Sequence, residues 1–400
     1  MTTPIHDPKR RQILQGAATL GGAAALGALL PTLARAQSES IRLGLMLPYT
    51  GTYAQLGVAI ENGFRLALDE KGGKLGGRAV EYFKVDDESD PAKATDNANR
   101  LITRDKVDVL IGTVHSGVAM GMVRVVRETG TLLIIPNAGA DAATGPLCAP
   151  NVFRTSFTNW QPVHPLGKVM AERGHKNAAF ITWKYAAGEE SLASFKEGFS
   201  KVGGRVMKEL FLPFPNVEFQ ALLTEIAAAK PDAVACFFAG AGAVKFAKDY
   251  AAAGLKEKIP LYGSGFLTEG VLAAQGDAAE GLLTTLHYSD SLDLPKNKAF
   301  RSAYSKAYKS NADVYAVQGY DTGLLLLQSF EKTRGKVDKT ALMKAMEGAT
   351  IDSPRGKWRM SKAHNPIQDI YLRRAEKGEN KVIGVAWKAL DDPARGCKMS

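Results

Sequence analysis

Hydrophobic residues occur along this chain in short runs that alternate with longer amphipathic stretches. Residues 41–47 form a mostly apolar run of strand length, which Pro48 ends. Residues 58–70 then carry apolar side chains at the spacing of a helix. The alternation continues with further apolar runs at 79–85, 108–111 and 132–135. Strands separated by helices of this length predict a parallel sheet with right-handed crossovers.

The second half of the chain repeats this alternation, with apolar runs at 178–183, 205–211 and 232–238. These strands are too many for one compact sheet. The segment 153–161 combines Ser and Thr with Trp160 and predicts a crossing between two lobes, with further crossings at 287–290 and 349–354. Short strands with turns are expected at 355–390. The sequence therefore predicts an α/β fold of two doubly wound parallel-sheet lobes.

The first 36 residues have the pattern of an export signal. A basic region, Lys9-Arg10-Arg11, precedes an uncharged Gly/Ala/Leu stretch at 16–33, and Ala34-Arg35-Ala36 supplies the small residues of a cleavage site. The pattern predicts a signal peptide over 1–36, cleaved after Ala36, and a periplasmic protein. The paired arginines resemble a Tat signal, although Lys9 stands where such signals carry Ser or Thr, so the Sec route stays open. The alternative is an uncleaved membrane anchor, which the Gly/Ala content disfavours.

The distribution of charge and the number of cysteines limit the classes of function that fit this chain. The predicted signal peptide contains four basic residues and one acidic residue, Asp7. Its removal lowers the formal net charge of the chain from +10 to about +7. The remaining basic residues are dispersed among acidic ones, which argues against nucleic-acid binding. Three cysteines in an oxidising compartment favour one disulfide. Because Cys236 lies in an apolar run, the predicted pair is Cys148–Cys397, with three free thiols as the alternative.

The sequence carries no recognisable catalytic or metal-binding motif. Patterns such as His-Glu-x-x-His, Gly-x-Ser-x-Gly and the Walker A loop are absent, and the six histidines lack metal-ligand spacing. Gly240-Ala-Gly242 predicts only a tight turn, because Lys245 stands at the third glycine of a dinucleotide fingerprint. We therefore expect no catalytic residue, metal or cofactor, and a secreted α/β enzyme is the weaker alternative.

Turns rich in Gly, Ser, Thr and Asn follow the predicted strands, at the edge where open α/β sheets bind ligands. In the turn 113–117, Ser116 is predicted to be a helix N-cap. Its hydroxyl, with the N–H groups of Gly117 and Val118, would hold a carboxylate at the helix N-terminus. The segment 136–140 presents a second row of backbone groups after the fourth strand.

The order of these segments resembles the type I periplasmic solute-binding proteins of ABC importers, in the branched-chain amino acid (Leu/Ile/Val) family. The resemblance spans essentially the whole mature chain and rests on Leu47-Pro-Tyr-Thr-Gly-Thr-Tyr-Ala-Gln-Leu-Gly57, Ile111-Gly-Thr-Val-His-Ser-Gly117, Asn151-Val-Phe-Arg-Thr155, Lys184-Tyr-Ala-Ala-Gly188, Tyr315-Ala-Val-Gln-Gly-Tyr-Asp321, Ser353-Pro-Arg-Gly356 and His364-Asn-Pro-Ile-Gln-Asp-Ile-Tyr371. It implies the type I periplasmic binding fold, with lobe 1 at 37–156 and 288–349 and lobe 2 at 157–287 and 350–400. It also implies a monomer that captures a small molecule between closing lobes and delivers it to an inner-membrane ABC permease.

The resemblance further implies the site residues. Ser116, Ala138 and Ala140 would face a ligand carboxylate from lobe 1, and Tyr185 would close over it from lobe 2. Aromatic walls would come from Tyr53, Trp160 and Phe238, although the last two fit ordinary packing equally well. The full predicted set comprises Tyr53, His115, Ser116, Gly117, Asn137, Ala138, Gly139, Ala140, Trp160, Tyr185, Phe238 and Gly265.

The chain differs from the amino-acid binders that it resembles at one position that bears on the class of ligand. Amino-acid binders of the family pair the ligand ammonium with an acidic residue in the turn after a late lobe-2 strand, and Gly265 stands there in this chain. An unpaired buried ammonium costs roughly several kcal/mol. Glu269 begins the next helix and would reach the site only if the loop were reshaped. We therefore predict a carboxylate without an amine, best an aromatic acid such as a benzoate derivative. A branched-chain amino acid or amide binder is the alternative, and a sensor domain a third.

Overall fold

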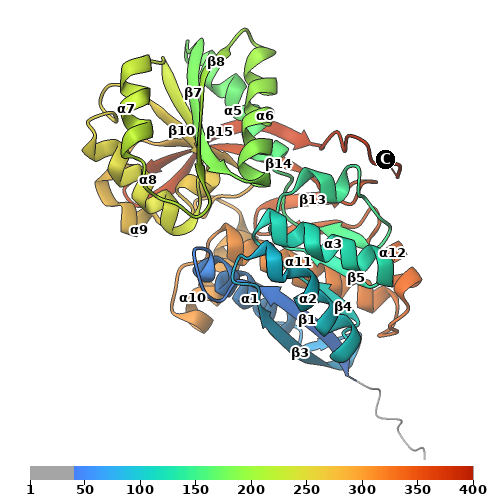
Figure 1. Cartoon of the computed structure of the whole chain (residues 1–400). Helices are drawn as coiled ribbons and strands as arrows, with labels where there is room; N and C mark the ends of the chain where they lie inside the picture. Colours follow the sequence, from blue (N-terminus) through green and yellow to red (C-terminus); the bar gives the residue numbers. More distant parts are fainter. Residues whose placement is uncertain (1–39, 400) are drawn as a thin grey trace, which may run out of the picture. The chain divides into compact units, whose positions relative to one another are not determined.

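The computed structural model describes residues 40–399, which form two β-sheets flanked by helices (Figure 1). The predicted signal peptide lies outside these residues. None of the helices in the described part is long and apolar enough to cross a membrane. We use the term first lobe for the first sheet with its helices and second lobe for the second sheet with its helices.

The first sheet has six strands in the order β2-β3-β1-β4-β5-β6. Its members are β1 (Ile41–Leu47), β2 (Lys74–Leu75), β3 (Arg78–Asp86), β4 (Val109–Ile111), β5 (Leu132–Ile135) and β6 (Val152–Arg154). All neighbours pair in parallel except β2, which is antiparallel to β3. Strand β1 lies in the middle and is buried on both faces, which explains its nearly continuous apolar run.

Helices connect and cover these strands. They are α1 (Ala54–Asp69), α2 (Ala94–Asn99), α3 (Ser116–Thr129) and α4 (Asp141–Thr144), with a 3₁₀ turn at Pro91–Lys93 and a π-helical turn at Arg100–Arg104; later in the chain come α10 (Pro295–Tyr308), α11 (Val314–Lys332) and α12 (Lys339–Met346). Helices α1 and α11 pack at very short range, since a Cβ at Gly63 would lie 1.8 Å from the Ala316 carbonyl oxygen. Only glycine fits there, and this contact fixes the start of α11 against α1.

The second sheet has nine strands in the order β12-β13-β14-β11-β10-β9-β7-β8, with β15 also paired to β14. Its strands are β7 (Asn177–Lys184), β8 (Arg205–Pro213), β9 (Ala233–Phe237), β10 (Leu261–Ser264), β11 (Leu283–Leu286), β12 (Thr350–Ser353), β13 (Gly356–Met360), β14 (Pro366–Glu376) and β15 (Glu379–Leu390). Its helices are α5 (Trp160–Glu172), α6 (Ala186–Ser200), α7 (Gln220–Ala229), α8 (Gly240–Ala252) and α9 (Leu272–Gln275), with 3₁₀ turns at Gly265–Leu267 and Gly276–Ala279. The part from β7 to β11 is parallel, as the sequence predicts.

The C-terminal part differs from the prediction in two ways. Strands β14 and β15 form a long antiparallel hairpin rather than short strands with turns. In addition, Ile351, Trp358 and Met360 of β12 and β13 lie in the hydrophobic core of the first lobe, and the Trp358 indole N–H donates to Asp321 of α11 at 3.0 Å. Residues of β12 and β13 therefore contact the core of the first lobe, although both strands pair within the second sheet. The predicted lobe boundaries and the predicted crossing at 349–354 stay predictions.

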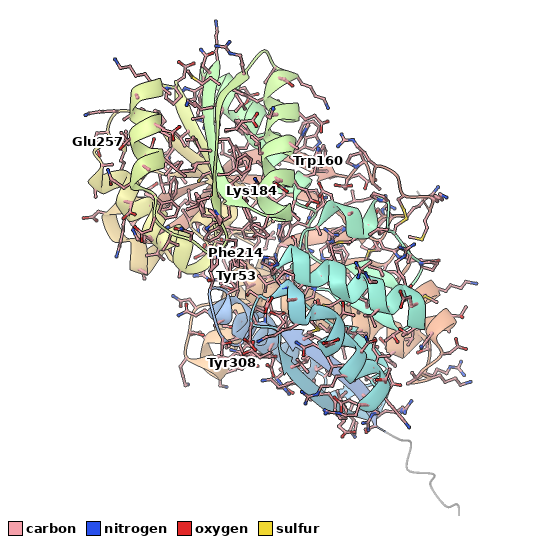
Figure 2. All side chains as sticks on the ribbon, in the orientation of Figure 1. Tyr53, Trp160, Lys184, Phe214, Glu257 and Tyr308 are labelled. Carbon is pink, nitrogen blue, oxygen red and sulfur yellow. A yellow bond between two sulfur atoms is a disulfide. The ribbon has the colours of Figure 1, made fainter. Side chains whose placement is uncertain are left out.

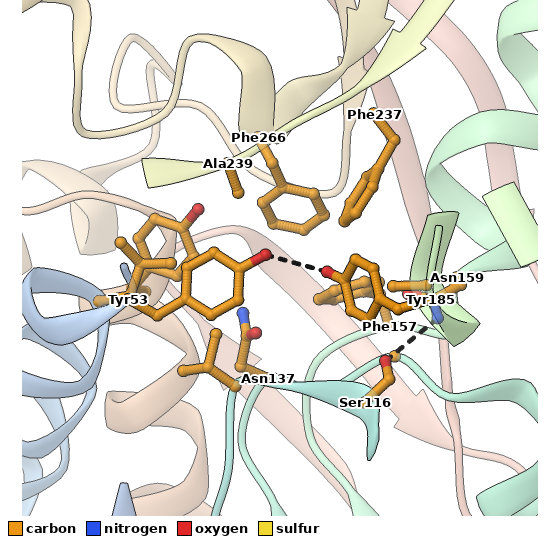
Figure 3. A pocket seen from close by; sticks show the side chains of 14 residues that line it. Tyr53, Ser116, Asn137, Phe157, Asn159, Tyr185, Phe237, Ala239 and Phe266 are labelled. Atoms are coloured by element: carbon orange, nitrogen blue, oxygen red, sulfur yellow. Dashed lines mark hydrogen bonds between the residues drawn. The ribbon is translucent and has the colours of Figure 1, made fainter. Parts of the chain in front are cut away.

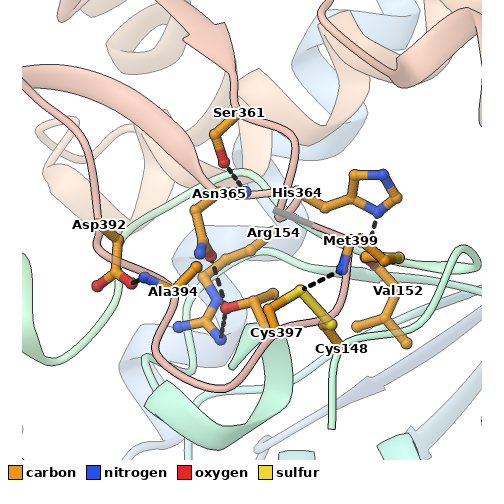
Figure 4. The surroundings of a disulfide bond; sticks show 11 residues. Cys148, Val152, Arg154, Ser361, His364, Asn365, Asp392, Ala394, Cys397 and Met399 are labelled. Carbon is orange, nitrogen blue, oxygen red and sulfur yellow. Dashed lines mark hydrogen bonds between the residues drawn. A yellow bond between two sulfur atoms is a disulfide. The ribbon is translucent and has the colours of Figure 1, made fainter. Parts of the chain in front are cut away.

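A disulfide ties the end of the chain to the first lobe (Figure 4). Cys148, in the loop between α4 and β6, is bonded to Cys397, with the two Cα atoms 5.5 Å apart. The predicted pairing is thus present in the structure, and Cys236 is a buried free thiol in β9, as expected. Because the tail follows β15 of the second sheet, the bridge adds a covalent link between the lobes.

Candidate functional site: a cavity between the lobes

A cavity lies between the two lobes (Figure 3). Both lobes contribute to its wall, chiefly from the turns that follow parallel strands. Its lining consists of Tyr53, Leu56, Val114, Ser116, Asn137, Gly139, Phe157, Asn159, Tyr185, Ala187, Phe237, Ala239, Phe266 and Tyr315. Six of these side chains are aromatic, and among residues 40–399 no charged side chain lines this cavity. The wall therefore suits a flat apolar group with few polar atoms.

The N-terminus of α3 brings polar groups to this wall. His115 is the N-cap of α3, and its Nδ1 accepts from the Gly117 N–H at 3.1 Å. The prediction that Ser116 is the cap is therefore wrong, because the extended residue is His115 and Ser116 already begins the helix. Ser116 is nevertheless buried against the cavity, so its hydroxyl stands beside the positive end of the helix dipole.

Asparagine side chains complete the polar part of the wall. Asn159 Nδ2 donates to Ser116 Oγ at 3.4 Å and to Glu190 Oε2 at 2.6 Å. Burial raises the pKa of Glu190. Asn137 Nδ2 donates to Gln318 Oε1 of α11 at 2.6 Å. These bonds fix the two amides, so the polar wall is preorganised before any ligand arrives.

An aromatic cluster joins the lobes beside the cavity. The hydroxyls of Tyr53 and Tyr185 are 2.9 Å apart, and the ring of His115 stacks on Tyr185 with centroids 4.7 Å apart. Phe214 packs on Tyr53 with a centroid distance of 5.4 Å, and the two residues lie together in Figure 2. Burial lowers the pKa of His115 to about 4, so its ring is neutral at pH 7. Tyr53 and His115 belong to the first lobe and Tyr185 and Phe214 to the second, so the cluster forms only when the lobes meet.

The turn after β10 contains no acidic side chain that reaches the cavity. A Cβ at Gly265 would lie 2.4 Å from Leu286 Cβ and 2.5 Å from the Nη2 atom of Arg373. Arg373 donates from Nη2 to the Gly265 carbonyl at 2.8 Å and pairs through Nη1 with Glu269 at 2.5 Å. Both partners of this ion pair are buried. Glu269 is therefore committed to Arg373, and Gly265 has no room for a side chain.

The model of the family described as periplasmic binding protein matches residues 40–380. This chain belongs to the periplasmic binding protein family. The two sheets, the crossings between them and the interlobe cavity agree with this assignment. The members compared below are solute-binding proteins of ABC transporters or carry the name of an amino-acid-binding protein.

Three relatives illustrate the range of similarity. The Leu/Ile/Val-binding protein homolog 6 of Brucella melitensis is 30% identical over 352 residues, which are 86% of this chain and 90% of the relative. A solute-binding protein of an ABC transporter from R. palustris, solved in complex with benzoate, is 52% identical with a TM-score of 0.88, covering 90% of this chain and 100% of that one. A third, from Rhodopseudomonas palustris BisB5 and solved with 3,4-dihydroxy benzoic acid, is 33% identical with a TM-score of 0.84, covering 88% and 99%.

The cavity of this periplasmic binding protein contains part of the predicted set. Tyr53, Ser116, Asn137, Gly139 and Tyr185 line it, while His115 and Gly117 lie directly behind the wall. The side chains of Ala138 and Ala140 instead lie in the hydrophobic core of the first lobe. The Ala138 N–H donates to the Thr113 carbonyl at 2.9 Å, so it has no bond to offer a ligand.

Three further predicted residues lie outside the cavity lining. Trp160 stacks on His164 and donates to Glu197 at 3.0 Å, away from Tyr53 (Figure 2). Phe238 packs in the second-lobe core against Trp183, and Gly265 lies under Arg373. In each case the sequence neighbour lines the cavity instead, namely Asn159, Phe237 and Phe266.

The prediction also missed Phe157 and Tyr315. Phe157 lies within the predicted crossing 153–161, and its ring contacts Phe266 with centroids 4.8 Å apart. Tyr315 begins the segment 315–321, which is part of the family resemblance, so its position in the sequence could have indicated a place in the site. Nothing in the sequence alone places either ring at the cavity, because their positions depend on how the two lobes meet.

Proposed function

We propose that this periplasmic binding protein captures a small aromatic carboxylate, a benzoate-like acid, and delivers it to an ABC permease of the inner membrane. The observation that carries the proposal is the composition of the cavity wall, which combines six aromatic rings with uncharged polar groups at the N-terminus of α3. The 52% identity to a chain solved with benzoate supports it.

The carboxylate would bind at the start of α3. The Ser116 hydroxyl is a donor at this point, and the helix dipole favours negative charge there. Asn159 orients this hydroxyl, because its Nδ2 donates to Ser116 Oγ and so leaves the Ser116 proton for the ligand. Neutral donors of this kind hold a carboxylate without the need for a buried arginine in the wall.

The ring would occupy the aromatic part of the wall. Phe157, Phe266 and Phe237 follow one another there, with centroid distances of 4.8 Å between the first two and 6.3 Å between the last two. Tilted aromatic contacts of this type contribute about 0.5–1.5 kcal/mol each beyond the buried area. An aliphatic ligand would gain the free energy of burying apolar area but not this aromatic contribution.

The surroundings of Gly265 disfavour an α-amino acid. A ligand ammonium near this turn would meet the Arg373 guanidinium, whose own counter-charge is Glu269. Among the described residues no carboxylate lines the cavity to pair with the ammonium, and a buried unpaired cation costs roughly several kcal/mol. The name of the Brucella relative keeps a branched-chain amino acid as the second candidate.

Lobe closure would couple binding to transport. The Tyr53–Tyr185 contact and the His115–Tyr185 stack form only when the lobes meet, so a ligand that fills the cavity favours the closed form. The permease would then recognise the closed form. We also propose that the protein acts as a monomer in the periplasm after cleavage behind Ala36, which N-terminal sequencing and size-exclusion chromatography of the exported protein will test.

Calorimetry on protein freed of co-purified ligand tests the proposed ligand class. Benzoate is expected to bind with micromolar or tighter affinity, and leucine to give no heat. Native mass spectrometry of the freshly purified protein gives an independent answer, because a retained ligand adds its own mass. Binding of leucine without binding of benzoate or any other aromatic acid would overturn the proposal in favour of the amino-acid binder.

A further inference from the structure

The side chains of the cavity wall include four hydroxyl groups, those of Tyr53, Ser116, Tyr185 and Tyr315. The Tyr315 hydroxyl is buried and has no hydrogen-bond partner among the described residues. The other hydroxyls of the wall differ in this respect, because those of Tyr53 and Tyr185 bond each other and that of Ser116 accepts from Asn159. A buried hydroxyl without a partner destabilises the folded protein, so this group calls for an explanation.

The position of Tyr315 is fixed from both lobes. It is the second residue of α11, and Asp313 caps this helix by accepting from the Ala316 N–H at 2.9 Å. The Val314 N–H donates to Glu269 of the second lobe at 2.8 Å. The ring stacks on Phe266, with centroids 6.0 Å apart and planes at 30°. The hydroxyl is therefore held in place and has little freedom to turn toward a protein partner.

Phenylalanine would fill the same space without the cost of an unpaired hydroxyl. The neighbouring wall residues Phe157, Phe237 and Phe266 show that the cavity otherwise uses plain rings. Burial raises the pKa of Tyr315, so the group stays a neutral hydroxyl that donates or accepts one bond. These properties fit a contact with a single polar substituent on the ligand.

We propose that Tyr315 is a specificity residue that hydrogen-bonds a ring hydroxyl of the ligand, so that the preferred ligand is a hydroxylated aromatic carboxylate. This inference rests on the proposed function, because it assumes that the carboxylate lies at Ser116 on α3 while the second polar group meets Tyr315 on α11. A site built to bond a hydroxyl discriminates against the analogue that lacks it, since its own polar group is then left unpaired.

The test compares four acids on two proteins. Benzoate and 2-, 3- and 4-hydroxybenzoate are titrated by calorimetry into the wild-type chain and into Tyr315→Phe. At least one hydroxybenzoate is expected to bind the wild type about tenfold more tightly than benzoate, which corresponds to one hydrogen bond. In Tyr315→Phe the ratio of the affinities for that hydroxybenzoate and for benzoate is expected to fall from about ten to about one.

A matched control separates specificity from general damage. Tyr250→Phe also removes one buried hydroxyl, which donates to the Ile259 carbonyl at 2.9 Å within the second lobe. This variant is expected to keep the wild-type order of affinities. If Tyr315→Phe retains the preference, or weakens all four acids equally, the role of Tyr315 is wrong. If the wild type binds none of the four acids, the proposed function itself fails.

Discussion

Removal of the Cys148–Cys397 disulfide is expected to destabilise the whole molecule rather than only its C-terminal tail. The bridge joins positions separated by 249 residues along the chain. Other contacts that hold the tail include the Thr158 hydroxyl bonded to Asp392 at 2.5 Å and an exposed ion pair of Arg395 with Glu197 at 2.9 Å. The perturbation is the double variant Cys148→Ser/Cys397→Ser, which leaves no new free thiol.

Loop-closure entropy gives the size of the effect. With 249 residues between the linked positions, the chain-entropy model gives about 5.5 kcal/mol at 25 °C as an upper value. Part of this is offset because the tail residues regain freedom in the folded state, at about 1–2 kcal/mol for each residue that detaches. We therefore expect a net loss of about 2–4 kcal/mol. For a folded chain of about 360 residues this lowers Tm by about 3–5 °C.

Urea unfolding followed by tryptophan fluorescence measures the loss, with and without reductant. Reductant is expected to bring the wild type to the midpoint of the double variant and to leave the double variant unchanged. Cys236→Ala serves as the control, because this buried thiol takes no part in the bridge. Equal midpoints for the oxidised wild type and the double variant would refute the reasoning.

Three further predictions concern the site and its support. Ser116→Ala is expected to weaken benzoate by about 1–3 kcal/mol in calorimetry, and an unchanged affinity would remove this hydroxyl from the site. Because burial lowers the pKa of His115 from 6.5 to about 4, the unfolded chain takes up its proton first as the pH falls. The comparison variant is His115→Asn, which keeps a capping side chain. Relative to this variant, the wild type should lose at most about 3 kcal/mol of unfolding free energy in urea as the pH falls from about 6.5 to 4. Parallel pH profiles of the unfolding free energy for the two proteins would contradict this. Arg373→Met is expected to cost about 3–5 kcal/mol because Glu269 is left unpaired, whereas Arg373→Met/Glu269→Leu should recover most of the loss. A single variant as stable as the wild type would show that the pair has no such role.

Much of the fold follows from local patterns in the sequence. The apolar runs at 41–47 and 132–135 coincide with β1 and β5, because central parallel strands are buried on both faces and read as continuous hydrophobic stretches. The long C-terminal hairpin of β14 and β15 could not be predicted from such local patterns. Trp358 packs in the first lobe while its strand neighbour β14 pairs with the second sheet, and this division depends on tertiary contacts that no local period encodes.

Part of the cavity lining was predictable from the sequence, but not each residue of it. Ser116, Tyr53 and Tyr185 line the cavity as expected, since each lies in a turn after a strand or at a helix start. Phe238 was predicted where Phe237 lines the wall. Successive residues of a strand and its extension point to opposite sides, so an offset of one position exchanges a cavity side chain for a core side chain.

The buried Arg373–Glu269 pair also restricts how this site can change its specificity during evolution. An acid at position 265, which an amino-acid ligand would require, has no room while Arg373 occupies the adjacent space. Loss of Arg373 alone leaves Glu269 buried without a counter-charge. A mutational path from this site to an amine-binding one therefore needs coordinated substitutions, with a destabilised protein at the intermediate step. On the proposed function, descendants of this chain should diversify more readily in the substituents of the ligand's ring than in the class of the ligand.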